Sequence, residues 1–494
     1  MLLMLIVVLL TGAFAAWFTE RWSALAPRWV AILTLSIEVL LMFALWTQAE
    51  LATDLPLAWF ADLYLPWITR FGIGFHLAMD GLSLLLIALT VLLGFMAVSS
   101  SWTEIKHRQG FYFFNLLFCL AGTVGVFLAV DLFLFFFSWE LMIIPMYFLI
   151  SIWGHENRTY AAIKFVIFTQ GSSLLLLLSI VAFALIQHHN GGVLSFDYFE
   201  LLNTKLEPNV AFWLMLGFFI PFCVKLPAVP FHTWLADAHT QAPTGASVIL
   251  AGIMLKTGAY GLLRFVIPLF PDAASQFAPI AMLLGTISVL YGAILAFAQT
   301  DLKRLIAYTS ISHMGFILLG IFSWNLFALQ GSVITLLAHG VSAAALFMIA
   351  GALQERLHTR ELSLMGGLWG PLPRLAALAL FFSVASLGLP GLGNFMGELL
   401  VLLGAFTVNP ILTCVTVLAL ILAPVYALNM IQKVFYGPLT QESPGADCSR
   451  REWLSLGILA IATICLGISA QTVLNLSSFS LKLEMQHFIE TAQK

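Results

Sequence analysis

Charged residues are scarce in this sequence, and their scarcity excludes an ordinary soluble domain. Only 9% of the 494 residues are Asp, Glu, Lys or Arg, whereas soluble globular proteins carry about a quarter. The 24 acidic and 21 basic residues nearly balance, at a net charge of −3, so no basic surface for nucleic acid is indicated. The rest is strongly apolar, with a mean hydropathy of +1.00, which predicts a membrane protein.

Cysteine is also rare, and its placement excludes the usual metal and cluster sites. No two of the five cysteines have zinc-site or iron–sulfur spacing: Cys119, Cys223, Cys414, Cys448 and Cys465. No Gly-rich dinucleotide-binding loop follows a predicted strand either. The sequence therefore predicts no metal and no cofactor in this chain itself.

The apolar residues fall into runs of about 20, the length that crosses a bilayer as a helix. These runs predict an all-α polytopic membrane protein with about 14 transmembrane helices, near residues 2–18, 28–47, 80–99, 111–130, 132–150, 160–186, 209–230, 243–268, 277–299, 303–322, 326–352, 373–395, 408–435 and 453–474. The first run lacks a basic leading segment and a convincing cleavage site. We therefore expect a retained helix rather than a signal peptide.

Basic residues gather on one side of the predicted helices. With the N-terminus outside, fourteen of the 21 basic residues, Lys303 among them, fall in cytoplasmic loops or helix ends. Five, including Arg264 and Lys494, fall on the opposite side, and Lys225 and Lys256 belong to neither. Because cytoplasmic loops carry the excess of Lys and Arg, both termini are predicted outside.

Two predicted helices carry sequences that break a helix. Residues 225–230 read KLPAVP, and residues 388–393 read GLPGLG. Proline removes a helical donor, and backbone groups freed at membrane depth need protein or water as partners. A pair of broken helices favours a transport site, although a proline kink used only for packing explains either break alone.

Three charged residues lie inside apolar runs: Glu140, Lys225 and Lys256. A charge at the bilayer centre costs about 2.5–3.5 kcal/mol on insertion scales, so Glu140 is expected to have a cationic partner, for which the two lysines are candidates. A static ion pair that only locks helix packing is the alternative. We favour a proton site, because the excess lysine has no second membrane carboxylate nearby in sequence.

Further polar candidates lie in the C-terminal half. Glu398 follows the second break and is either a proton site or a helix-end residue at the membrane surface. His313 and His339 lie inside apolar runs, where a neutral histidine both donates and accepts hydrogen bonds, so a relay and a merely satisfied group are equally expected. Three hydroxyl groups either extend this path or bond back to their own helix: Thr309, Ser310 and Ser312.

The spacing of the candidates is typical of an internal repeat. From Glu140 to His313 is 173 residues, and from Lys225 to Glu398 is also 173. Equal offsets are expected from two five-helix repeats, inverted because the helix number is odd, although two matches also arise by chance. The predicted organisation is three helices in 1–110, repeats in 111–268 and 277–435, and a loop, the last helix and a C-terminal tail in 436–494.

Three segments resemble the antiporter-like membrane subunits of bacterial respiratory complex I, the NADH-quinone oxidoreductase. They are WELMIIPMYFLI at 139–150, VKLPAVPFHTWLADAHTQAPT at 224–244 and DLKRLIAYTSISHMG at 301–315. The resemblance covers nearly the whole chain, and the motifs are long and specific. It implies a fourteen-helix fold with inverted five-helix repeats, two broken helices and a central hydrophilic axis.

The resemblance also implies roles for the candidate residues. It makes Glu140 the acid of an ion pair with Lys225, Lys256 the central connecting lysine, His313 and His339 relay residues, and Glu398 the terminal acid. The L- and N-type subunits usually have a lysine at the last position, so Glu398 favours the M type.

By this resemblance, the expected function is proton translocation in the inner membrane, coupled to electron transfer from NADH to quinone in other subunits. NAD, FMN, iron–sulfur clusters and quinone are implied in those partners, and L- and N-type subunits are the implied neighbours. Three alternatives stay open: a subunit of a multi-subunit Na⁺/H⁺ antiporter, a non-conducting membrane scaffold and, less well supported, a quinone-binding role.

Overall fold

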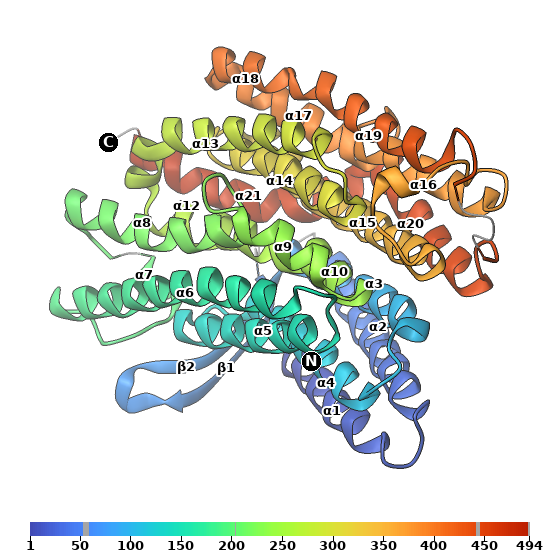
Figure 1. The fold of residues 1–494 in the computed structure, drawn as a ribbon. Coiled ribbons are helices and arrows are strands. Elements are labelled where there is room, and N and C mark those ends of the chain that lie inside the picture. Colours follow the sequence, from blue (N-terminus) through green and yellow to red (C-terminus); the bar gives the residue numbers. More distant parts are fainter. Residues whose placement is uncertain (53–58, 203, 441–444, 493–494) are drawn as a thin grey trace.

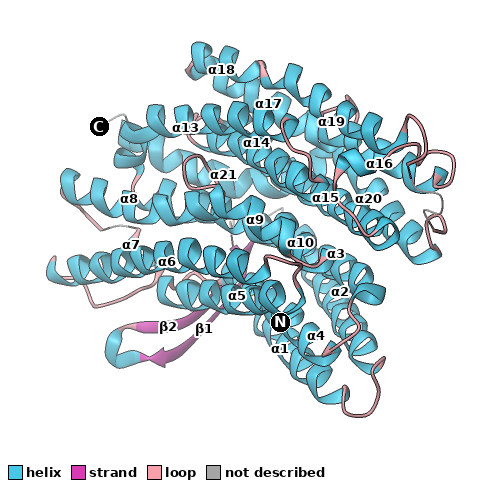
Figure 2. Ribbon diagram, in the orientation of Figure 1, coloured by secondary structure: helices cyan, strands magenta, loops and turns pink. Residues whose placement is uncertain are grey.

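The computed structural model describes residues 1–52, 59–202, 204–440 and 445–492, and these residues are mostly helical (Figures 1 and 2). Within this part of the chain, thirteen helices are long and apolar enough to cross a membrane. Two shorter apolar helices, α16 (Pro373–Ser386) and α17 (Gly393–Val408), form a further, interrupted element. The predicted all-α membrane fold with about fourteen spans is therefore confirmed, apart from one pair of strands.

The first three long helices frame that pair of strands, a β-hairpin that the sequence analysis missed. The elements are α1 (Leu2–Thr19), α2 (Ala26–Ala52), β1 (Trp59–Ile68), a 3₁₀ turn at Thr69–Phe71, β2 (Ile73–Asp80) and α3 (Gly81–Glu104). The strands pair antiparallel with Leu63 opposite Leu77. Gly72, at φ +68°, supplies the left-handed residue that the turn requires. The aromatic residues of this segment favour strands, and its charges disfavour a membrane span.

The next elements make the first half of the bundle. They are α4 (Gln109–Leu128), α5 (Leu132–Trp153), α6 (Arg158–His189), α7 (Tyr198–Leu201), α8 (Pro208–Lys225), α9 (Thr233–Gln241) and a span composed of α10 (Thr244–Ile249), η2 (Leu250–Met254), α11 (Leu255–Gly261), η3 (Leu262–Val266) and α12 (Ile267–Leu269). The segments η2 and η3 are π-helical. The whole 244–269 span is buried, so the widened turns lie in the interior of the protein.

The second half follows with the same order of elements. It comprises α13 (Pro271–Phe297), α14 (Leu302–Ile321), α15 (Leu326–Leu357), a 3₁₀ turn at Leu362–Leu364, the interrupted pair α16 and α17, and α18 (Pro410–Val417) with α19 (Ala419–Phe435). The helix α17 was not predicted, because the predicted span 373–395 was drawn through the break. After this half come α20 (Arg450–Ile468) and α21 (Ala470–Ala492), the latter in what was predicted as a tail.

Two capped loops repeat between the halves at opposite ends of the bundle. Asp131 caps α5 and pairs with Asp197 in an isolated β-bridge, while Asp301 caps α14 and pairs with Glu361 in another. Asp131 accepts a hydrogen bond from Gly74 N of the hairpin. At the other end of the bundle, Arg304, three residues after Asp301, contacts Asp237 on α9. This arrangement is what inverted repeats would produce. The repeats themselves, and the domain boundaries drawn from them, stay predictions.

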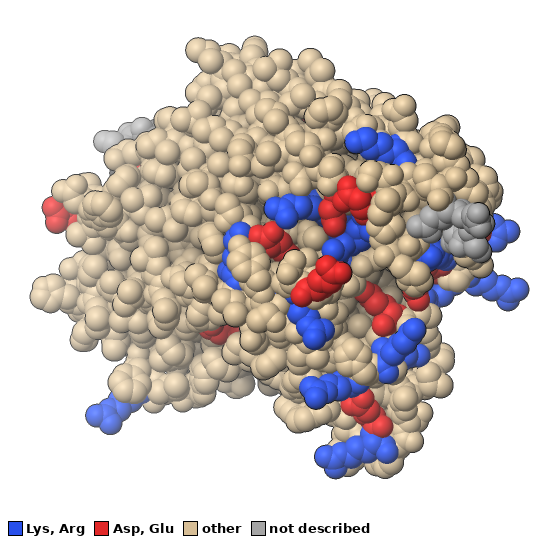
Figure 3. All heavy atoms as spheres, in the orientation of Figure 1, with Lys and Arg blue, Asp and Glu red and all other residues tan. Residues whose placement is uncertain are grey.

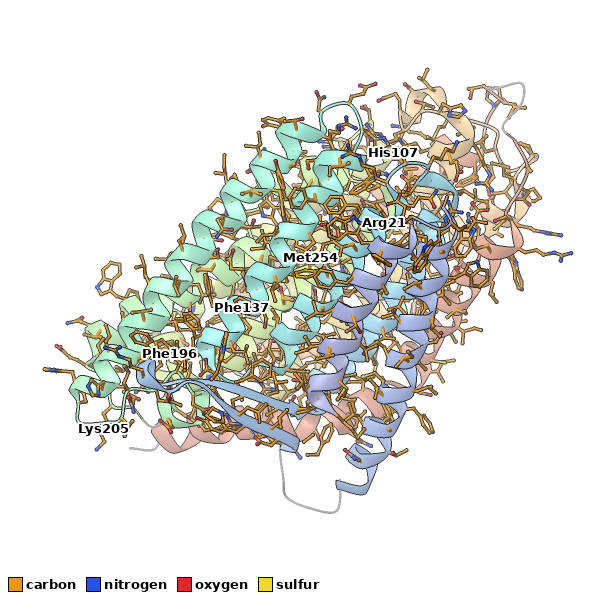
Figure 4. The ribbon with its side chains drawn as sticks, turned by 90° about the horizontal axis from the view of Figure 1, so that it is seen from below. Arg21, His107, Phe137, Phe196, Lys205 and Met254 are labelled. Carbon is orange, nitrogen blue, oxygen red and sulfur yellow. The ribbon has the colours of Figure 1, made fainter. Side chains whose placement is uncertain are left out.

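The two ends of the bundle differ. In Figure 4 the β-hairpin and α21 lie across one end, near Phe196 and Lys205, and we call this the hairpin end. Arg21 and His107 lie at the other, which we call the basic end and which faces the viewer in Figure 3. There the charged side chains gather around α9, α10 and α15, while the area over α13 and α18 shows none.

The termini lie where the sequence predicts, on one side, but two of the basic residues do not lie at the surface. Met1 and α21 both lie at the hairpin end, in keeping with termini on one side of the membrane. Two residues counted as surface cations are instead buried: Lys303 is 0% and Arg264 3% exposed. Lys494 lies outside the described residues.

Candidate functional site

Both predicted helix breaks are present, and each places a titratable side chain beside it. Helix α8 ends at Lys225, and the chain resumes as α9 at Thr233. Helix α16 ends at Ser386, and α17 begins at Gly393 with Glu398 in its second turn. Lys225 and Glu398 are both buried, so the broken helices carry charges into the interior. Lys225 precedes its break whereas Glu398 follows its own, so the equal 173-residue offset does not mark equivalent positions.

Four of the six predicted site residues form one row through the interior. Lys256 Nζ lies 2.7 Å from His339 Nδ1, the His339 and His313 rings lie 5.3 Å apart at their centroids, and His313 Nδ1 lies 2.7 Å from Glu398 Oε1. Each residue is at most 4% exposed. We call these four residues the buried row; it runs from α11 through α15 and α14 to α17.

The local fold explains the position of Lys256. In the π-helical segment η2, the Leu255 amide donates to Leu250 O instead of Ala251 O. The Ala251 carbonyl is thereby freed, and it accepts from Lys256 Nζ at 2.5 Å. The widened turn therefore supplies the acceptor that a buried ammonium needs.

The buried row has unused hydrogen-bonding capacity at one point. His313 has both ring nitrogens engaged, because Nε2 also contacts Ser386 Oγ at 3.1 Å. His339 Nε2 is buried and has no partner among the described residues. A ring with one engaged and one free nitrogen can take a proton on one side and give it up on the other.

Glu140 and Lys225 are close but not in contact. Lys225 Nζ and Glu140 Oε1 are both buried without a hydrogen-bond partner among the described residues. The charge of Glu140 reaches Lys225, yet no ion pair within 4 Å forms between them. The ammonium instead lies 5.5 Å from the ring centroids of both Trp139 and Phe165. The expected ion pair is therefore open in this structure.

The three hydroxyl candidates bond to backbone rather than to the buried row. Thr309 and Ser310 donate to Ile306 O of their own helix, and Ser312 donates to Val289 O on α13. Thr309 and Ser310 therefore bond back to their own helix, as one of the two expectations had it, whereas Ser312 fulfils neither expectation because its partner lies on another helix.

A group of three polar side chains that the sequence did not predict, Glu104, Lys303 and His239, joins the buried row to the basic end. Glu104 accepts from Thr244 N at 3.1 and 3.0 Å, and Lys303 Nζ donates to Ala242 O at 3.1 Å. His239 is fully buried and stacks on Phe347, with ring centroids 4.4 Å apart. Neither of its ring nitrogens has a partner among the described residues, and the charges of Lys303 and Lys256 both reach it.

A cavity of about 310 Å³ opens beside this group at the basic end, and we call it the vestibule. Its lining includes Glu104, Lys106, His155, Glu355 and Arg451. Burial, together with the positive charges of Lys303 and Arg360, lowers the pKa of His155 to about 3, so this histidine is neutral near pH 7. The vestibule therefore brings polar surface to the half-buried Glu104.

The functional residues that were not predicted differ in whether the sequence carries a signal for them. Lys303 stands beside Arg304 at the start of a helix, and adjacent residues there point about 100° apart, so one faces inward while the other reaches Asp237. His239 lies seven residues after His232, the spacing of one helical face, which was a usable signal. Arg264 pairs with buried Asp80, 184 residues away, and lies over Trp59, which is still more distant in sequence, so no local pattern predicts these contacts.

Among the described residues, no group of three or more His, Cys, Asp or Glu side chains could hold a metal ion, and all five cysteines are free. The site's chemistry is that of proton donors and acceptors: two lysines, histidines and carboxylic acids.

This chain is similar to a known protein family and to individual known proteins. The profile of the family described as "NADH:quinone oxidoreductase/Mrp antiporter, TM" matches residues 129–423. The NADH-quinone oxidoreductase subunit M of Pseudomonas aeruginosa is 50% identical over 487 residues, which cover 97% of this chain and 96% of that protein.

Two solved structures share the fold. A chain of respiratory complex I from Thermus thermophilus with bound NADH superposes with a TM-score of 0.89 at 30% identity, covering 99% of this chain and 100% of that one. A chain of the Mrp complex from Dietzia sp. superposes with a TM-score of 0.84 at 20% identity, covering 98% and 97%. The second likeness shows the fold alone.

Proposed function

The chain belongs to the NADH:quinone oxidoreductase/Mrp antiporter transmembrane family, with half of its residues identical to a subunit M, and from this premise we propose how it works. It is a membrane subunit of an NADH-quinone oxidoreductase that moves protons across the bilayer. Electron transfer from NADH through flavin and iron–sulfur centres to quinone takes place in partner subunits. The single observation that carries the proposal is the buried row.

Within the buried row, protons pass between neighbouring groups. Lys256 Nζ donates to His339 Nδ1 at 2.7 Å, a distance for direct transfer. Transfer leaves a neutral amine on Lys256 and an imidazolium on His339, whose free Nε2 carries the next bond. A bridging water carries the proton across the gap to His313 Nε2, in place of the contact of that nitrogen with Ser386 Oγ. His313 Nδ1 then gives its own proton to the Glu398 carboxylate through the 2.7 Å contact, which leaves a neutral imidazole.

The first half supplies the bias that makes the movement directional. When the Glu140 carboxylate approaches Lys225, it stabilises the ammonium, and when it withdraws, a desolvated ammonium favours release. Because Glu140 Oε1 and Lys225 Nζ have no hydrogen-bond partner in the described part of the chain, the closed arrangement would satisfy both atoms. The broken helices α8–α9 and α16–α17 are the elements that provide this movement.

Protons enter from the basic end, which faces the cytoplasm in this proposal, and both termini lie on the periplasmic side. Glu104 and Lys303 connect the vestibule to His239, whose unpartnered ring lies within the electrostatic reach of Lys256 and His339. From Glu398 the proton leaves toward the opposite side. L- and N-type subunits are the proposed neighbours along the membrane.

The test uses the complete complex in proteoliposomes with an enclosed pH-sensitive dye. On addition of NADH and quinone, the wild type acidifies the lumen, and His339→Gln, which keeps a polar side chain but cannot carry a proton onward, acidifies it at least about tenfold more slowly. His189→Gln, at an exposed site, is the matched control. Full pumping by His339→Gln contradicts the proposal.

The same preparation separates the rivals. A Na⁺/H⁺ antiporter exchanges sodium for protons without NADH, whereas this proposal requires NADH and tolerates sodium-free buffer. A scaffold predicts normal pumping when buried charges are neutralised. Purification of the tagged chain in mild detergent adds a further check, since NADH oxidation with flavin and iron–sulfur absorbance should migrate with it.

A further inference from the structure

An apolar groove of about 640 Å³ runs along the outside of the bundle between α2, α3 and α20, which lie on one side of the molecule (Figure 1). Ile32, Leu92, Phe95, Leu454 and Ile458 line it. Its two serines, Ser99 and Ser455, bond to each other at 2.7 Å and offer the groove no free polar group. The groove wall therefore suits a hydrocarbon chain.

One end of the groove carries two arginines that lack carboxylate partners. Arg451 lines the groove, and Arg28 lies 5.5 Å above the ring of Trp102, which also lines it. The Nε atoms of both arginines are buried and without a hydrogen-bond partner among the described residues. The positive charge of Arg28 opposes that of Arg451, while the charges of Glu452 and Glu355 favour it, so an anion beside Arg28 would relieve the remaining repulsion.

The nearby acids do not pair with these arginines. Glu452 is held by both Nη atoms of Arg356, at 2.9 and 2.8 Å, and caps its own helix through Ser449. Glu355 accepts from Thr103 Oγ1 at 3.1 Å. The remaining donors of the two arginines reach neutral oxygens, Arg451 to Thr103 Oγ1 at 3.1 Å and Arg28 to Ile105 O at 3.3 Å. Thr103 thus links Arg451 to Glu355, whereas no acid acts on Arg28 among the described residues, so the positive charge at the mouth of the groove is least compensated at Arg28.

The depth of this mouth matches a lipid headgroup. Trp102 packs edge-on against Trp29, with ring centroids 5.5 Å apart, and tryptophans with arginines beside them are typical of the membrane–water interface. The mouth also lies at the basic end, where the chain's cations concentrate. A headgroup bound here borders the vestibule, since Ser99 and Arg451 line both spaces.

We propose that this groove binds an anionic phospholipid, with an acyl chain along α2, α3 and α20 and the phosphate between Arg28 and Arg451. Acyl contact contributes apolar burial, and the arginine pair selects the negative headgroup over a zwitterionic one. The site places a fixed negative charge beside the vestibule without taking part in proton transfer.

The test is photolabelling of the whole complex in phosphatidylcholine bilayers containing a photoactivatable phosphatidylglycerol with the reactive group on its acyl chain. The expected result is labelling of peptides from α2, α3 and α20, competed by unlabelled phosphatidylglycerol and not by phosphatidylcholine. Arg28→Gln and Arg451→Gln should each weaken this competition about fivefold, the effect of one arginine near a lipid surface. Arg450→Gln, exposed on the same turn as Arg451, is the matched control and should change nothing.

Several outcomes would overturn the proposal. Absence of label from these helices means that a neighbouring subunit covers the groove, and equal labelling by a photoactivatable phosphatidylcholine means that only hydrocarbon is recognised. Unchanged competition in the glutamine variants removes the role of the arginines. If these variants fail to assemble, Arg28→Lys with Arg451→Lys keeps the charges, and the preference must then persist and weaken with salt.

Discussion

In the first half of the bundle an acid and an amine stand apart, whereas in the second half an acid and an imidazole are in contact. Among the described residues, Glu140 Oε1 and Lys225 Nζ have no hydrogen-bond partner, while Glu398 and His313 lie 2.7 Å apart. Lys256 belongs to the first half by sequence, yet its ammonium bonds to His339 in the second. The first pair is thus open, while Lys256 is bonded to the second half of the bundle.

A second contrast lies in the capped loops that the halves share. At the hairpin end, His76 contacts both Asp62 and Asp197, so a titratable cation holds the first bridge. At the basic end, Arg360 Nε holds Asp301 at 3.1 Å, so a permanent cation holds the second. The same backbone arrangement is thus sensitive to pH in one half and insensitive in the other.

Replacing the amine of the open pair should have the largest effect. Lys225→Ala is expected to lower proton pumping on the order of 100-fold, because it removes the group that the acid controls. Lys225→Arg should lower it as much, since arginine keeps the charge and the packing but does not release a proton. Pumping is measured as dye response in proteoliposomes, with assembly checked by NADH oxidation and exposed Lys433→Ala as the control. Rescue by arginine would favour a static ion pair instead.

The closed pair should respond less strongly. Glu398→Gln keeps a hydrogen-bonding side chain beside His313 but cannot hold the proton, so pumping is expected to fall about tenfold, equivalent to about 1.4 kcal/mol. The decrease is smaller than for Lys225, since His313 retains Ser386 as a second contact. Glu398→Asp, which keeps the acid, should recover part of the rate. Wild-type pumping by the glutamine variant would remove Glu398 from the route.

Replacing His239 tests whether the protons for both halves enter the protein at the basic end. His239→Phe should preserve stacking on Phe347 while removing both ring nitrogens, and pumping should fall severalfold. The initial rate should fall without a change in the final pH gradient, because the route is slowed and not uncoupled. A variant with an unchanged rate would show that protons bypass this histidine.

The pH contrast between the two bridges should give the smallest effect. Burial opposes protonation of His76, but hydrogen bonds and the charges of Asp197 and Asp62 prevail and raise its pKa to about 8. The contribution to stability, about 2 kcal/mol, is therefore fully present below the ordinary pKa of 6.5 and is lost as the pH rises through about 8.

Hydrogen exchange measures this contrast. Between pH 6 and 9, and after correction for intrinsic rates, exchange in β1, β2 and the start of α5 should accelerate, while the start of α14 should not change. His76→Gln should remove the difference. Equal acceleration at both bridges would contradict the assignment.

Most of the fold was predictable because bilayer thickness and hydropathy fix the length of each span. The breaks were predictable from Pro227, Pro230 and Pro390, whose chemistry is local. The hairpin was not predicted because its two strands mix apolar and polar residues without the strict alternation that indicates a strand. The two π-helical turns around Lys256 leave no local sequence signal, since the 244–269 span reads as an ordinary apolar helix.

The site was predictable to the extent that a charge inside an apolar run is unusual. Glu140, Lys225 and Lys256 stood out for that reason, and so did the two histidines of the buried row. Lys303 and Arg264 did not, because they lie near span ends, where a basic residue normally reports orientation. Their burial depends on contacts with Ala242 and Asp80, which are distant in sequence.

The central claim is that the buried row carries protons and is not merely a structural network. Its most direct test is the ratio of protons pumped to NADH oxidised in proteoliposomes for Lys256→Arg, which keeps a cation for Ala251 O and His339 but does not release a proton. The account predicts an assembled complex with a markedly lower ratio than the wild type. A wild-type ratio would contradict it.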